Sequence, residues 1–195
     1  MINWGMIGCG SVTEVKSGPA FSKVQGSKLV AVMRRNRELA EDYARRHKVP
    51  KVYSEASDLI NDNEVDAVYI ATPPGSHARY AIETLRAGKP VYIEKPMALN
   101  YEECELINEA AARYGKPVYV AYYRRALPGF LKVKELIENG TIGKGLFFSL
   151  ELFKPASEDE KAGKLPWRVD PSLSGGGHFF DLASHQLDYF DYLFG

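Results

Sequence analysis

Cysteine is scarce in this sequence, and long apolar runs are missing altogether. The two cysteines, Cys9 and Cys104, have neither the spacing of a metal site nor that of a redox pair, which favours a reduced compartment. No stretch approaches the ~20 apolar residues that a membrane span requires. The first residues, MINWGMIGCG, lack the basic region and the apolar run of a signal peptide. We therefore expect a soluble, cytoplasmic protein that contacts no membrane.

Excess charge is also absent, because 25 basic residues balance 25 acidic ones. A neutral chain gives no electrostatic reason to expect nucleic acid or an anionic membrane as a partner. The remaining composition is typical of a globular protein, with 45% hydrophobic residues. A chain of 195 residues can bury a core in one large or two small domains.

Short apolar runs alternate with amphipathic segments through the first 121 residues. Helical periodicity is clear at 36–47 and 77–87, and Gly88 and Gly115 are placed as helix C-terminal caps. Apolar strands that alternate with helices predict parallel βαβ units and an α/β, doubly wound (Rossmann) sheet. The predicted strands are 2–7, 28–33, 65–71, 90–93 and 117–121.

The pattern changes after about residue 121. Residues 127–138 predict a helix, 145–153 an antiparallel strand and 154–174 a long loop, before a final helix. We predict a dinucleotide-binding domain over 1–121 and an α+β substrate and oligomerisation domain that begins at 122.

A glycine turn follows the first predicted strand. Gly8 permits a tight turn there, and Gly10 allows a pyrophosphate to approach the backbone N–H groups. The candidate cofactor contacts in this turn are Gly8, Cys9, Gly10, Ser11 and Val12. The third position of the G-x-G-x-x-G pattern is Thr13, which weakens the motif. An ordinary tight loop is the alternative.

An acidic residue is missing at the end of the second predicted strand. NAD sites usually have Asp or Glu there for the adenine ribose, whereas this chain has Arg34 and Arg35. A guanidinium can bind the 2′-phosphate of NADP through charge-assisted hydrogen bonds. We predict NADP as the cofactor, with NAD possible. The alternative is two solvated arginines at the start of a surface helix.

Two further segments follow predicted strands and should face the same crevice. In the first, Thr72, Pro73 and Pro74 form a stiff loop before His77 opens a helix, and all four are candidate cofactor contacts. In the second, Glu94 and Lys95, which are also candidate cofactor contacts, precede a proline that allows a cis peptide bond. A surface lysine and a structural histidine are the alternatives.

The final helix carries four polar residues on one stripe, at offsets of three, seven and ten. They are His178, Asp181, His185 and Asp188, preceded by three glycines. Such a stripe could hold a metal, transfer protons or simply form a polar helix face.

Taken together and in their order along the chain, the motifs of residues 2–195 resemble those of the glucose–fructose oxidoreductase/inositol dehydrogenase (Gfo/Idh/MocA) family. The motifs are G-x-G, ATPP before a helix, AGKPVYIEKP, a Gly-Thr-Ile-Gly corner and GGG-x(3)-D-x(3)-H. The resemblance implies that Lys95, Asp181 and His185 surround the substrate beside the nicotinamide. It implies no metal and no catalytic role for His178.

Physical chemistry is consistent with these roles. Oxidation of an alcohol releases a hydride and a proton, and an imidazole can accept the proton near neutral pH. An ammonium group at Lys95 would stabilise developing alkoxide charge, while Asp181 would orient His185 or bind a second hydroxyl. Either Lys95 or His185 could be the base. Tyr122 is a further candidate for substrate contact.

Trp167 and Arg168 are candidate cofactor contacts, because a similar pair in relatives lies near the nicotinamide. Packing and surface charge are the alternative for both.

Family members continue beyond this histidine motif into an open sheet that commonly builds the oligomer. We expect the chain to be an N-terminal piece or a shortened form, and to form a homo-oligomer through its second domain. The 145–153 strand would expose an edge and four apolar side chains, which favours self-association. These side chains are Phe147, Phe148, Leu150 and Phe153.

Three functions fit these observations. The first is an NAD(P)-dependent oxidoreductase, acting on a secondary alcohol of a sugar, polyol or cyclic diol. The second is a hydrolase or lyase that oxidises a sugar transiently and retains the cofactor. The third is a dinucleotide-binding module without catalysis. We favour the first.

Overall fold

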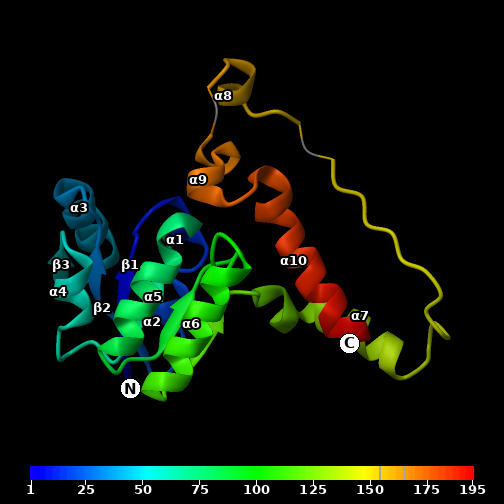
Figure 1. The fold of residues 1–195 in the computed structure, drawn as a ribbon, viewed down its shortest axis with the longest axis horizontal. Coiled ribbons are helices and arrows are strands. Elements are labelled where there is room, and N and C mark those ends of the chain that lie inside the picture. Colours follow the sequence, from blue (N-terminus) through cyan, green and yellow to red (C-terminus); the bar gives the residue numbers. More distant parts are fainter. Residues whose placement is uncertain (154, 165) are drawn as a thin grey trace. The chain divides into compact units, whose positions relative to one another are not determined.

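The computed structural model describes residues 1–153, 155–164 and 166–195. It divides into two compact units, Met1–Ala121 and Tyr122–Gly195. Figure 1 traces their elements along the chain. Residues 154 and 165, which belong to the predicted loop over 154–174, lie outside the described part.

The first unit contains a six-stranded sheet in which every neighbouring pair is parallel, in the order β3-β2-β1-β4-β5-β6. This is the strand order of a Rossmann fold, so the predicted fold class is confirmed. The three-residue strand β3 was not predicted from the sequence. The strands are β1 Ile2–Ile7, β2 Ser27–Met33, β3 Lys51–Tyr53, β4 Ala67–Ile70, β5 Val91–Ile93 and β6 Val118–Val120.

Helices cover both faces of this sheet. Side chains that alternate along β1 and β4 enter two separate cores, so that Met6 and Tyr69 face α2 and α3 while Ile7 and Ile70 face α4, α5 and α6. The helical elements are α1 Ser11–Val15, α2 Ala20–Lys23, α3 Arg37–His47, α4 Ala56–Ile60, the 3-10 turn η1 Pro74–Ser76, α5 His77–Arg86 and α6 Tyr101–Tyr114.

Asparagine side chains begin the two longest helices of this unit. The side chain of Asn36 accepts a hydrogen bond from Leu39 N, and that of Asn100 accepts one from Glu103 N. Each therefore satisfies a backbone donor that the first helical turn leaves open. The caps fix where α3 and α6 begin, directly after the sheet edge that carries the predicted site.

All regular elements in the described part of the second unit are helical. Helix α7 agrees with the prediction over 127–138, and α10 carries the predicted stripe of polar residues. The elements are η2 Tyr123–Ala126, α7 Pro128–Glu138, α8 Glu158–Lys161, η3 Trp167–Val169, α9 Pro171–Ser174 and α10 Gly177–Phe194.

The predicted strand over 145–153 does not form. These residues have no regular secondary structure, and Leu146, Phe147 and Phe153 are each 88–90% exposed. A strand persists only when a neighbour accepts and donates its backbone hydrogen bonds. The described part of this unit contains no other strand that could pair with it.

The predicted loop over 154–174 contains three short helical elements. Before α8, Ser157 and Glu160 form a capping box, in which each side chain bonds the other residue's backbone N–H. Asp170 caps α9 through Ser172 N. The S-x-x-E pattern at 157–160 is a sequence signal for such a helix start, which the loop prediction overlooked.

Candidate active site

The glycine turn connects β1 to α1. Gly8 has a φ of +95°, and a Cβ there would lie 2.9 Å from both Thr72 N and Ala71 C. Backbone atoms cannot move aside as a flexible side chain can. The fold itself therefore requires glycine at position 8.

Gly10 differs from Gly8 in this respect. Its φ of −112° suits any residue, and a Cβ built there meets nothing within 4 Å. Packing therefore leaves open space beside the backbone at the start of α1. A dinucleotide pyrophosphate needs such a close approach to backbone N–H groups, so the residues present fit this group. Ser11 and Val12, the first residues of α1, border the same turn.

Thr13 occupies the position where the motif usually has a third glycine. Its side chain is completely buried, and its hydroxyl donates to Gly10 O at 2.8 Å. The Thr13 carbonyl accepts a hydrogen bond from the Tyr43 hydroxyl at 3.0 Å. Because these polar atoms have partners, threonine fits between α1 and the sheet at no desolvation cost. The missing glycine does not prevent the turn from forming.

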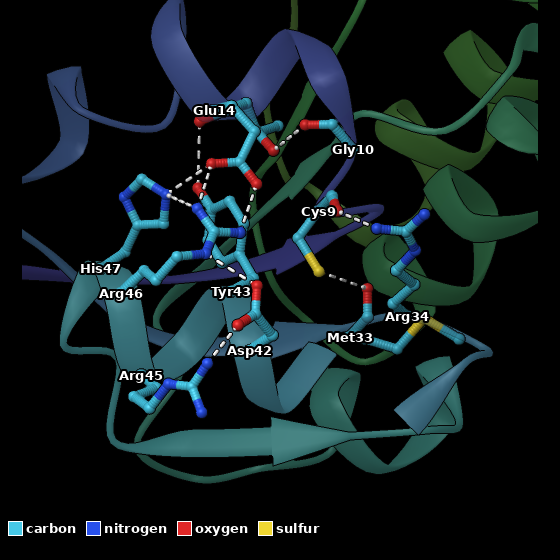
Figure 2. A network of polar contacts seen from close by, with 11 residues as sticks. Cys9, Gly10, Glu14, Met33, Arg34, Asp42, Tyr43, Arg45, Arg46 and His47 are labelled. Carbon is cyan, nitrogen blue, oxygen red and sulfur yellow. Dashed lines mark hydrogen bonds and ion pairs between the residues drawn. The ribbon is translucent and has the colours of Figure 1, made fainter. Parts of the chain in front are cut away.

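A network of charges joins α1 to α3 (Figure 2). The Glu14 carboxylate accepts two hydrogen bonds of 2.7 Å from Arg46, and the His47 ring nitrogen lies 2.8 Å from it. Bonds from the guanidinium lower the pKa of Glu14 to about 2. Arg46 also bonds Asp42. The helix that follows the glycine turn is therefore held by α3.

Arg34 follows β2 and reaches back to the glycine turn (Figure 2). Its Nη1 donates to Cys9 O at 3.0 Å, whereas Arg35 is exposed. The Cys9 thiol is buried, which raises its pKa, and it lies 3.9 Å from Met33 O. The Arg34 guanidinium is thus fixed at the point where the adenine ribose of a bound dinucleotide is expected. Arg34 is not the freely solvated side chain of the alternative interpretation.

The loop after β4 lies next to the glycine turn, since Ala71 N donates to Ile7 O at 2.8 Å. Within it, the Ser76 hydroxyl donates to the Thr72 hydroxyl at 2.7 Å. Pro73 is exposed, whereas Pro74 is buried. Pro74 therefore anchors the loop, and Thr72 and Pro73 remain the better candidates for cofactor contact.

His77 is fully buried, and this revises its predicted role as a cofactor contact. Its Nδ1 lies 2.9 Å from Pro96 O, and its Nε2 lies 2.7 Å from Thr72 O. Burial lowers the pKa of this imidazole. Both ring nitrogens already face protein carbonyls, so neither is directed at a ligand.

Glu94 and Lys95 follow β5, and the Lys95–Pro96 peptide bond is cis. The Glu94 carboxylate accepts the Tyr69 hydroxyl at 2.5 Å and the Lys95 backbone N–H at 3.3 Å. Tyr69 is completely buried, and burial raises its pKa, so it remains the donor. Glu94 is thus a support for the turn that carries Lys95. No sequence signal marked Tyr69, because it belongs to a continuously apolar strand.

In the second unit, the stripe on α10 forms as predicted, and its members have different partners. His178 Nε2 lies 2.9 Å from Glu160 Oε1, and the Arg125 Nε–H is shared between the two carboxylate oxygens of Asp188, at 2.9 and 3.0 Å. These contacts attach α8 and η2 to α10. His178 and Asp188 therefore have structural roles in this unit.

The other two members of the stripe are the predicted catalytic residues. His185 is 4% exposed, and its ring makes edge-to-face contacts with Tyr122 and Tyr123 at centroid distances of 5.9 and 5.2 Å. Asp181 accepts a hydrogen bond from Arg168 Nε at 3.0 Å. These tyrosines and this arginine hold the side chains on one face of α10.

Trp167 and Arg168 contact each other, with the guanidinium 4.6 Å from the centre of the indole ring. Arg168 also pairs with Asp181, whose side chain is 16% exposed. Trp167 and Arg168 were predicted as cofactor contacts, and the bond between Arg168 and Asp181 was not predicted. Arg168 lies in η3 and Asp181 in α10, so no single periodic pattern joins them in the sequence.

Four predicted segments share one edge of the parallel sheet, because they follow the carboxyl ends of β1, β2, β4 and β5. Among the residues that the structure describes, no three His, Cys, Asp or Glu side chains gather in a metal-binding arrangement. No helix in the described ranges is long and apolar enough to cross a membrane.

Comparison with known proteins decides the family. Residues 2–122 match the family model described as an oxidoreductase family with an NAD-binding Rossmann fold, and residues 130–195 match the GFO/IDH/MocA C-terminal domain. The chain belongs to the Gfo/Idh/MocA oxidoreductase family. The resemblance seen in the motifs is therefore confirmed.

Several relatives in this family cover nearly the whole chain. Oxidoreductase P35 of Formosa agariphila is 47% identical over 100% of this chain and 61% of its own length. Inositol 2-dehydrogenase 2 of Saccharopolyspora erythraea is 34% identical over 93% of this chain and 52% of its own. The crystal structure of an NAD-binding oxidoreductase from Klebsiella pneumoniae, 29% identical, superposes with a TM-score of 0.76 over 100% of this chain and 53% of that one. The chain thus spans about half to three fifths of these relatives.

Proposed function

We propose that this protein is an NADP-linked oxidoreductase that acts on a secondary alcohol of a sugar, a polyol or a cyclic diol. The observation that carries the proposal is the glycine turn. A Cβ at Gly10 would meet no protein atom within 4 Å, so the space beside this backbone is open to a ligand. The Rossmann strand order and the family membership support a nicotinamide dinucleotide as the ligand of that space. Inositol 2-dehydrogenase 2, one of the relatives, supports a polyol as the substrate class.

Each proposed residue has a distinct chemical task. Oxidation of the alcohol breaks a C–H bond and an O–H bond, so two electrons leave with a hydride and a proton leaves separately. A bound nicotinamide supplies the acceptor for the hydride. Lys95 hydrogen-bonds the reacting oxygen and stabilises its developing negative charge. His185 or Lys95 takes the proton, and Asp181 orients His185 or binds a second hydroxyl.

NADP is preferred over NAD in this proposal because of Arg34. Its Nη1 donates to Cys9 O, and a guanidinium has five N–H donors, so the same side chain can also bind a 2′-phosphate. The described residues at the end of β2 include no carboxylate that would bind the ribose hydroxyls of NAD instead, since Met33, Arg34, Arg35 and Asn36 follow one another there. Trp167 and Arg168 are proposed to contact the nicotinamide end.

The proposal is tested by incubating the protein with NADP or NAD and a panel of inositols, sugars and cyclic diols. We expect reduced cofactor to accumulate, as followed by its absorbance, with NADP giving the higher kcat/KM. Turnover of a glycoside without net reduced cofactor would instead indicate transient oxidation with a retained cofactor. Tight cofactor binding without turnover of any compound would indicate a binding module.

A further inference from the structure

His77 connects two loops at the sheet edge that carries the glycine turn. It is the first residue of α5, and its imidazole is completely buried. One ring nitrogen faces Thr72 O, in the loop after β4, and the other faces Pro96 O, in the turn after β5. A single rigid ring thus spans two segments that are distant in sequence.

We infer that His77 is a positioning residue for Lys95, because it fixes the carbonyl of Pro96 against the loop after β4. The inference rests on the proposed function, in which Lys95 contacts the substrate oxygen. It assigns His77 no contact with cofactor or substrate.

The residue before Lys95 is held in a complementary way. The Tyr69 hydroxyl donates to Glu94, and the same carboxylate accepts the Lys95 backbone N–H. Tyr69 faces the core that contains Phe21, whereas Ala81 and Leu85, on the helix that His77 opens, face the opposite core. The backbone around Lys95 is therefore anchored on both sides of the sheet.

Anchoring of this kind matters for rate more than for binding. A catalytic group misplaced by about 1 Å can cost on the order of 10²-fold in rate, although the ligand still binds. A neutral imidazole donates one N–H, so loss of the ring removes the donor from one of these carbonyls and the contact that spaces the other, and water or a backbone shift must then compensate. The turn after β5 can then shift, and the backbone that carries Lys95 shifts with it.

The matched control for His77 is Thr84 on the same helix. Thr84 is also completely buried, and its hydroxyl donates to Tyr80 O at 2.7 Å, within α5. Replacing Thr84 with Val removes one buried hydrogen bond without touching either loop. Replacing His77 with Leu removes both contacts with the loops, and His77→Gln restores an N–H donor on a side chain of similar reach.

The kinetic experiment compares these variants in the active protein at saturating polyol. We expect His77→Leu to lower kcat by about 10–100-fold, a larger factor than any rise in the Kd for NADP that follows from loosening Thr72 and Pro73, and His77→Gln to recover part of the loss. Thr84→Val should keep the wild-type kcat. Equal kcat values for His77→Leu and Thr84→Val, after correction for any unfolded fraction, would overturn the inference.

Hydrogen exchange tests the connection without any turnover. We expect His77→Leu to raise amide exchange at 71–77 and at 94–98 together, whereas Thr84→Val raises it in α5 alone. Faster exchange at 71–77 with unchanged exchange at 94–98 would overturn the inference. If the wild-type protein oxidises no polyol, the proposed function fails, and the exchange data alone then decide whether His77 holds the two loops together.

Discussion

Gly8 and Gly10 are two residues apart, and each is glycine for a different reason. At Gly8 a Cβ would strike backbone atoms of the neighbouring loop, so the requirement comes from folding. At Gly10 a Cβ would enter open space, so folding does not require glycine there, and we propose that a ligand approaching the backbone does. Gly8→Ala and Gly10→Ala should therefore differ in their effects on stability and on NADP affinity, and this difference tests whether the space beside Gly10 binds a cofactor.

Gly10→Ala should leave the thermal midpoint within about 2 °C of wild type, because the structure contains nothing for the methyl group to strike. The same variant should weaken NADP binding at least tenfold, as measured by fluorescence titration. Gly8→Ala should lower stability by roughly 1–3 kcal/mol or more, because its φ is positive and backbone atoms lie too close. Full NADP affinity in Gly10→Ala would show that no ligand uses this space.

Arg34→Ala should raise the Kd for NADP about 10–100-fold, the loss expected for charge-assisted hydrogen bonds of about 1.5–3 kcal/mol. The Kd for NAD should change little, because NAD has no 2′-phosphate. Arg37→Ala is the control, since Arg37 pairs with Glu41 on the exposed face of α3. Tighter binding of NAD than NADP by the wild-type protein would contradict the cofactor assignment.

Asp62 supports the fold rather than the site. Its carboxylate, which is 9% exposed, accepts hydrogen bonds from Lys51, Tyr53 and Glu64 N, and the Lys51 bond is the main cause that lowers its pKa to about 2. Because the folded-state pKa lies below the usual value of 3.8, the stabilisation is complete above about pH 4. It is lost as the pH falls towards 2.

Asp62→Asn should therefore lower the free energy of unfolding by about 2 kcal/mol at pH 7. The difference from wild type should shrink as the pH is lowered from 4 to 2, as followed by urea denaturation. Asp58→Asn, at an exposed position of the neighbouring helix, should have almost no effect at any pH. A deficit that stays constant down to pH 2 would contradict the assigned pKa.

Residues with strong local signals could be predicted, and residues that act through space could not. Gly8, Gly10 and Lys95 lie in recognisable patterns, and they follow β1 and β5, two strands that the sequence predicts. His77 was predicted to contact the cofactor, because the sequence does not show that both of its nitrogens face carbonyls. Tyr69 gave no signal, since in a continuously apolar strand a tyrosine serves packing as well as it serves polar contacts.

At the scale of elements, α1 depends on α3 for its position. Helix α1 has only five residues, too few to be stable alone, and the Glu14–Arg46 pair ties it to an eleven-residue helix. The Tyr43 hydroxyl adds a bond to Thr13 O. The geometry of the glycine turn is thus maintained partly from α3.

Glu14→Gln should lower the thermal midpoint by about 2–4 °C, the shift expected for about 1 kcal/mol in a chain of this size. Amide exchange should rise across α1, because the neutral side chain binds Arg46 more weakly. Glu41→Gln breaks an exposed pair within α3 and should change neither quantity measurably. Unchanged exchange in α1 of Glu14→Gln would mean that the charges do not hold this helix.

Helices and strands could be predicted where the apolar pattern repeats over enough residues, and not where the element is too short to show it. Five strands and the helices α3, α5, α7 and α10 were predicted from the sequence, whereas α6 was indicated only by its C-terminal Gly115. The three-residue β3 has too few residues for a period to be visible. Apolar and polar residues do alternate over 145–153, but a strand also needs a neighbouring strand to pair with, which this alternation does not reveal.

At the scale of the molecule, the second unit exposes many apolar side chains. Leu146, Phe147 and Phe153 lie almost fully in solvent, and Phe179 is 75% exposed. Exposed apolar groups that cluster in one segment favour association. This supports the expected self-association, although the segment is not the strand edge that the sequence indicated.

Light scattering on the 195-residue polypeptide should show a mass that rises with concentration. The double variant Phe147→Ser/Phe153→Ser should reduce this rise, since each substitution removes an exposed aromatic ring. The outcome against the prediction is a monodisperse monomer with protected amides over 145–153.

The central claim is that Lys95 and His185, ninety positions apart, act on one substrate. It is tested most directly by the steady-state kinetics of Lys95→Met and His185→Asn, together with their Kd values for NADP. We predict that each variant loses about 10²–10⁴-fold in kcat on the polyol that wild type oxidises, while NADP still binds. Wild-type rates in both variants would contradict the claim.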